Sequence, residues 1–116
     1  MEMILKLSDK EVGLRFTVKT VRDLKTEKSI DVLSDEKSIQ DNILDYYAGV
    51  LLFSAKAYAK KHNTGEEFTE DDAWDWIDEL GLSSEKLTEV ILKFNESIVK
   101  DVPVSKKKAT KATAKK

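Results

Sequence analysis

The sequence predicts a mainly α-helical protein that begins with a short β-hairpin, continues as a compact bundle of about four helices and ends in a disordered basic tail. Three observations lead to this fold class. Apolar residues alternate with polar ones in two short runs near the start, they recur every three to four positions over most of the remainder, and lysines among alanines and threonines occupy the end. We expect a single domain over residues 1–103 and a tail over 104–116.

The expected hairpin covers about residues 2–17. Apolar side chains occupy every second position on both sides of the polar segment 8–11, which is the pattern of two strands with one buried face. A hairpin alone is marginally stable in water, so the helices that follow must cover this face. Its residues are Met3, Leu5, Leu7, Val12, Leu14 and Phe16.

A short helix is expected over residues 18–25, because valines and a leucine recur there at helical spacing. Thr17 precedes it, and its hydroxyl can accept a hydrogen bond from an unpaired amide of the first turn. The polar segment 26–37 shows no clear periodicity, and we expect a loop with at most a short extended or helical piece.

The rest of the chain is organised around a long helix, expected over residues 38–61, capped by Ser38 and stopped near Gly65. Apolar residues between 43 and 58 occupy almost every side of this helix, whereas an ordinary surface helix has one apolar stripe. Because a four-helix core cannot cover all these sides, we expect an exposed apolar patch that marks an interaction surface. Gly49 lies within this helix, where glycine costs about 1 kcal/mol relative to alanine, and it predicts a tight crossing with another element.

Two further helices complete the expected bundle. Thr69 and Asp72 have the spacing of a capping box, and Gly81 is placed to end that helix with a positive φ. Ser83 or Ser84 then caps a last helix with one clean apolar stripe. The stripe consists of Leu87, Val90, Ile91, Phe94 and Ile98.

Trp74 and Trp76 are two positions apart, so they cannot both face the same side of a helix. We expect Trp74 to face the core and Trp76 to be an exposed anchor for a partner. With residues of the long helix, Trp76 belongs to a set of interface candidates, some of which must instead be core. The candidates are Tyr46, Tyr47, Leu51, Phe53 and Trp76.

No catalytic, cofactor-binding or metal site is expected, and we expect a non-enzymatic protein. The chain has no cysteine, which excludes disulfides, thiolate ligands and a cysteine nucleophile. The single histidine, His62, has no second ligand or triad partner at a suitable spacing. The acidic segment 66–79 lacks the glycine and alternating oxygen ligands of a calcium loop, and the four glycines form no phosphate-binding loop.

The charge is unevenly distributed. Net charge is -2 for the chain, but the six lysines after residue 104 leave 20 − 6 = 14 basic residues against 22 acidic ones in the remainder. A tail of this kind can neutralise phosphates, so a small nucleic-acid-binding or regulatory protein is the alternative function, although the tail has no aromatic residues to stack on bases. The acidic body of a neighbouring copy is another target for the tail. Its cations are Lys106, Lys107, Lys108, Lys111, Lys115 and Lys116.

The start of the chain lacks the basic segment and apolar run of a secretory signal, and no apolar run reaches the roughly 20 residues that span a membrane. We therefore expect a cytoplasmic protein.

The order of these parts resembles that of the tail assembly chaperones of long-tailed bacteriophages, in their short, non-frameshifted form. The likeness spans about residues 3–99 and comprises a hairpin that runs into GLRFTVKTVRDLK, the apolar helix DNILDYYAGVLLFSAKAYAKKH, the segment EEFTEDDAWDWIDELG and a closing helix. The resemblance implies a protein without cofactors that self-associates into a ring or spiral and coats the tape-measure protein in the host cytoplasm. It also implies a longer, frameshift-extended form of the same chain as a partner, and no place in the mature virion.

Overall fold

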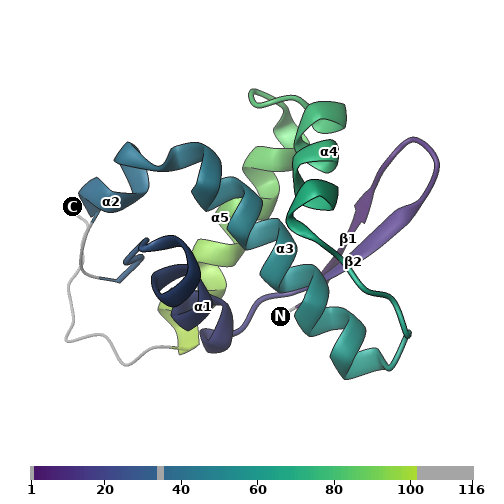
Figure 1. Cartoon of the computed structure of the whole chain (residues 1–116), viewed down its shortest axis with the longest axis horizontal. Helices are drawn as coiled ribbons and strands as arrows, with labels where there is room; N and C mark the ends of the chain where they lie inside the picture. Colours follow the sequence, from purple (N-terminus) through teal and green to yellow (C-terminus); the bar gives the residue numbers. More distant parts are fainter. Residues whose placement is uncertain (1, 34–35, 102–116) are drawn as a thin grey trace.

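The computed structural model describes residues 2–33 and 36–101 (Figure 1). The mainly helical fold with an N-terminal hairpin is confirmed, whereas the predicted tail over 104–116 lies outside the described residues. Within the described ranges, two strands precede five helices: β1 (Glu2–Lys6), β2 (Glu11–Arg15), α1 (Val18–Lys28), α2 (Glu36–Asp41), α3 (Ile43–His62), α4 (Glu70–Leu80) and α5 (Glu85–Asp101).

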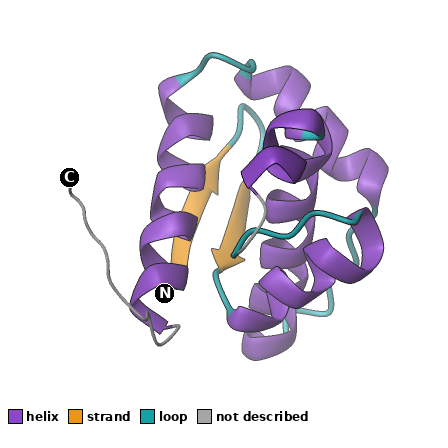
Figure 2. Ribbon diagram, turned by 90° about the vertical axis from the view of Figure 1, so that its left-hand side faces the viewer, coloured by secondary structure: helices purple, strands orange, loops and turns teal. Residues whose placement is uncertain are grey.

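The hairpin is antiparallel, with Leu5 opposite Val12. Its predicted apolar face is buried except for Met3 and Leu7, which are partly buried, and Figure 2 shows the strands between α5 and the remaining helices. Phe94 of α5 packs edge-on against Phe16, with 5.9 Å between ring centroids. The helix therefore covers the hairpin that would be marginally stable by itself.

The helix α3 is covered by the rest of the chain along most of its length. It packs against β2, α1 and α4, and apolar side chains remain exposed only in its first turn, where Ile43 is 37% and Leu44 is 46% exposed. The expectation that a small bundle cannot cover this helix is therefore wrong beyond its first turn. The reason is a series of small residues that lets neighbouring elements approach on several sides: Ala48, Gly49, Ser54, Ala55 and Ala59.

Gly49 marks the predicted tight crossing, and the neighbour is α1. A Cβ atom added at Gly49 would collide with a terminal methyl of Leu24 and contact the stem of Lys28. The ammonium group of Lys28 continues to Glu70 at the start of α4 and forms an ion pair there. The absence of a side chain at Gly49 thus lets Lys28 of α1 pass α3 and reach α4.

The helix predicted over 38–61 is divided in two. Asn42 separates α2 from α3, and its side-chain amide donates to the carbonyl of Ser38 at 2.9 Å. Such side-chain bonds to the backbone compete with a continuous helix. Ser38 lies inside α2 and accepts a hydrogen bond from the amide of Asp31, so it does not cap the long helix.

Three predicted helix caps are confirmed. The hydroxyl of Thr17 accepts from the amide of Thr20 at 3.2 Å, Thr69 and Asp72 form the capping box, and Gly81 follows α4 with φ 89°. Ser84, not Ser83, caps the last helix.

Two predicted helix ends are displaced. The helix α1 continues three residues beyond the predicted end, to Lys28, and closes on Ser29 in the left-handed region. Asn63, with φ 56°, ends α3, and Gly65 with its positive φ belongs to the loop that follows.

Candidate interaction surfaces

Three of the five interface candidates belong to the core. Tyr46 is 2%, Leu51 0% and Trp76 4% exposed, so none of them is available to a partner in the folded chain. The hydrophobic pattern could not distinguish them from surface residues, because α3 is apolar on most sides and only the chain path decides which sides are covered. Tyr47 and Phe53 are half-buried and each lines one of two surface hollows.

Tyr46 is a buried polar contact between two helices. Its hydroxyl donates to Oδ1 of Asn95 at 3.0 Å, and its ring lies edge-on to Phe94. Burial raises the pKa of Tyr46 to about 12, because the phenolate would lose its hydration. The residue therefore fixes α3 against α5.

The two tryptophans have the reverse of their predicted orientation. Trp76 packs edge-on against Phe68 with 5.3 Å between ring centroids, while the half-buried Trp74 donates its indole N–H to Glu70 at 3.3 Å. The buried stripe of α4 runs through Ala73, Trp76 and Ile77, at i, i+3 and i+4. Trp74 lies outside this stripe and is the tryptophan that remains partly accessible.

An apolar groove lies between the start of α3 and the first half of α5. It encloses about 200 Å³, and the leucines on its rim, Leu82 and Leu92, are 52% and 56% exposed. Ile43 and Leu44, one turn before Tyr47 on α3, extend this apolar surface along the helix. The lining of the apolar groove consists of Tyr47, Leu82, Leu87, Ile91 and Leu92, with the polar Thr88 and Asn95.

A second hollow, the basic cleft, encloses about 530 Å³ between the end of β2, the start of α1 and the second half of α3. Its floor contains the apolar side chains of Phe53 and Ala57. Its cations are Arg15, Lys19, Lys56, Lys60 and Lys61.

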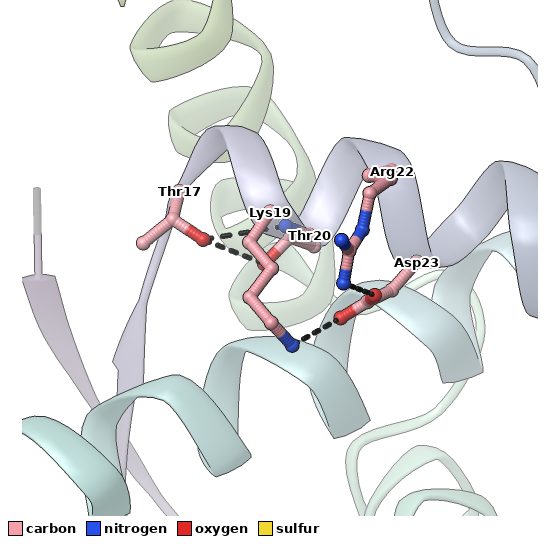
Figure 3. A network of polar contacts seen from close by, with 5 residues as sticks. All are labelled: Thr17, Lys19, Thr20, Arg22 and Asp23. Carbon is pink, nitrogen blue, oxygen red and sulfur yellow. Dashed lines mark hydrogen bonds and ion pairs between the residues drawn. The ribbon is translucent and has the colours of Figure 1, made fainter.

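Figure 3 shows the α1 wall of the basic cleft. Asp23 is held by two cations, Lys19 at 3.2 Å and Arg22 at 3.4 Å, while Thr17 and Thr20 are joined by the cap of α1. The single acidic side chain among those that line the cleft is therefore already paired within α1.

Sequence reasoning missed the basic cleft, because its cations come from two segments, residues 15–19 and 56–61, that are distant in the chain. The one local signal was the spacing of Lys56, Lys60 and Lys61 at the end of α3. Lys60 and Lys61 are favourable near the negative end of the helix dipole without any partner, so this spacing predicts no hollow.

His62 joins the end of α3 to the start of β1. Its Nε2 lies 2.9 Å from a carboxylate oxygen of Glu2, and its ring stacks on Tyr58 with 4.2 Å between centroids. Over residues 2–33 and 36–101, no three His, Cys, Asp or Glu side chains are grouped so that they could hold a metal ion. In the same ranges, no helix is both long and apolar enough to cross a membrane.

Comparison of the chain with protein-family models, with curated proteins and with solved structures finds no match in any of the three.

Proposed function

We propose that the protein is a tail assembly chaperone, which self-associates and coats the tape-measure protein of a long-tailed phage until the tail tube assembles around it. The observation that carries the proposal is the apolar groove, an uncovered apolar surface on a chain that otherwise covers its own core. The order of hairpin, long apolar helix and two closing helices agrees with the family that the sequence resembles.

The groove can bind the apolar face of a helix from the client protein. Its lining comes mainly from α5, with Tyr47 of α3 and Leu82 of the preceding loop at its sides, and a client helix can lay its apolar residues against this surface. Burying one leucine contributes about 1.5–3 kcal/mol, whereas association costs about 4–15 kcal/mol in lost freedom. A single copy therefore binds weakly, and a coat of many copies along one client gains its strength from avidity. This requirement links self-association to client protection.

The proposal is tested by co-expression with a fragment of the tape-measure protein from the same genome. The wild-type chain is expected to keep the fragment soluble. The double variant Leu82→Ser/Leu92→Ser is expected to need about tenfold more protein for the same effect, because two exposed apolar contacts are lost. The measurement is the soluble fraction of the fragment as a function of chaperone concentration.

Val18→Ser is the matched control, since Val18 is equally exposed but lies at the start of α1, away from the groove. It is expected to behave as wild type. Failure of the wild-type chain to keep the fragment soluble contradicts the proposed function, and equal protection by the Leu82/Leu92 variant contradicts the role of the groove.

A further inference from the structure

Five cations gather in the basic cleft of an otherwise acidic body, and two of them are paired, Arg15 with Glu2 and Lys19 with Asp23. Five of the 14 basic residues before residue 105 line it. Lys56, Lys60 and Lys61 form no ion pair among the described residues, and Lys56 and Lys60 are one helical turn apart, where like charges are destabilising. Internal pairing therefore accounts for only two of the five cations, and an anionic group from outside the chain would relieve the repulsion among the three lysines of α3.

The apolar residues of the cleft indicate which kind of anionic group fits it. Phe53 and Ala57 offer apolar surface between the cations, and the hollow has room for several side chains. A small inorganic anion would leave this floor uncovered. The cleft fits a surface that presents carboxylates together with an apolar or aromatic side chain.

The helix α4 presents such a surface. Asp71, Asp75 and Asp78 recur at i, i+4 and i+7, so they lie on one side of the helix, and Trp74 lies among them at i+3. All three carboxylates are exposed and form no ion pair within the described ranges, and Trp74 is the partly accessible tryptophan. We call this surface the acidic face of α4. Its carboxylates at i and i+4 have the same spacing as Lys56 and Lys60, about 6 Å along a helix axis.

The two surfaces belong to different elements. In Figure 1, α1 lies below α3 and α4 lies above it, and no residue of α4 lines the basic cleft. We propose that the basic cleft binds the acidic face of α4 of a second copy of this chain. Because the two surfaces differ, each copy can bind one neighbour on either side, and copies join head to tail into a ring or a spiral. This inference rests on the self-association in the proposed function and names its contact.

The experiment measures the mass of the full chain by size-exclusion chromatography with light scattering. The wild type is expected to exceed its monomer mass of 13.2 kDa at low salt and to dissociate as salt rises to about 0.5 M, because exposed charges are then screened. Two charge reversals, Lys56→Glu/Lys60→Glu in the cleft and Asp75→Lys/Asp78→Lys on α4, should each weaken association at least tenfold. Mixed in equal amounts, the two variants should associate with each other, because the acidic cleft of one variant then meets the basic α4 of the other.

Glu89→Lys/Glu96→Lys is the matched control, because it reverses two exposed acids on α5, and circular dichroism establishes that every variant is folded. If either charge-reversal variant associates as well as the wild type, or if the mixture of the two fails to restore association, the proposed contact is overturned and self-association is left intact. A wild type that is monomeric at all concentrations overturns both. A monomer that binds an oligonucleotide through Lys56 and Lys60 overturns the contact and assigns the cleft to phosphates. The solubility assay with the tape-measure fragment tests the proposed function independently of this contact, because it changes Leu82 and Leu92 and none of the charged residues.

Discussion

The phenol of Tyr46 shows how one buried polar group can tie two helices together. Its hydroxyl donates to Asn95, and its ring lies against the aromatic cluster that covers the hairpin. The raised pKa follows from burial, since the charged form would be left without water. The same burial makes Tyr46 a source of pH-dependent stability.

Tyr46→Phe is expected to reduce the dependence of stability on alkaline pH. The pKa of an unfolded tyrosine is about 10 and that of folded Tyr46 is about 12, so the contribution of Tyr46 is complete below pH 10 and is lost as pH rises through 12. In this window the free energy of unfolding falls by at most about 1.4 kcal/mol per pH unit from this group. At pH 7 the variant should lose about 1 kcal/mol, because the bond to Asn95 is removed.

The measurement is urea unfolding of wild type and variant at pH 7 and at pH 11. Tyr47→Phe is the control, because Tyr47 is half-buried on the same helix, and it should keep the alkaline decline of the wild type. An unchanged decline in Tyr46→Phe would show that burial of this phenol does not set the alkaline limit.

The tryptophan pair shows what residue spacing can determine. Two positions on a helix differ by about 200°, so the sequence requires that Trp74 and Trp76 face different sides. Which one is buried depends on whether Ala73 and Ile77 face α3, and that is decided by the packing of the whole helix.

At the scale of elements, β2 and α3 lie close together at Gly13. A Cβ atom added at Gly13 would overlap the ring of Tyr58, so the glycine is needed for the ring to lie on the strand. Elsewhere in a strand, alanine is favoured over glycine by about 0.5–1 kcal/mol. Whether Gly13→Ala raises or lowers the free energy of unfolding therefore shows how tightly β2 and α3 are packed at this position.

Gly13→Ala is expected to lower the free energy of unfolding by about 1–3 kcal/mol, because the added methyl forces the Tyr58 ring away from β2. In a Tyr58→Leu background the same substitution should cost much less. The double-mutant cycle, measured by chemical unfolding, gives the coupling between the two residues. A neutral or stabilising effect in the wild-type background would contradict a tight contact.

At the scale of the whole molecule, α5 joins the hairpin to the helices. Phe94 is fully buried and contacts Phe16 of the hairpin segment and Tyr46 of α3. One continuous set of buried residues includes strands and helices alike. The chain should therefore unfold as one unit.

Phe94→Ala should cost about 3–5 kcal/mol, a large share of the roughly 5–15 kcal/mol that stabilises a small domain. Strand and helix signals in circular dichroism and tryptophan fluorescence should be lost in the same transition. Leu92→Ala on the same helix, exposed at 56%, is the control and should change stability by less than about 0.5 kcal/mol. Separate transitions for hairpin and helices would contradict a single core.

The sequence by itself determined the features that depend on neighbours a few residues away. Thr17, Thr69 and Gly81 were predicted as helix ends because a cap bond joins a side chain or amide to a backbone group within one turn. The hairpin face and the stripe of α5 followed from periodicity for the same local reason.

Only the tertiary structure decided which apolar sides of α3 are covered and which charges share a hollow. Tyr46 and Leu51 became core, and Arg15, Lys19 and Lys56 became one cleft, because the chain path brings β2, α1 and α3 together. Burial and charge clustering depend on contacts between residues distant in sequence, whose geometry no local pattern contains.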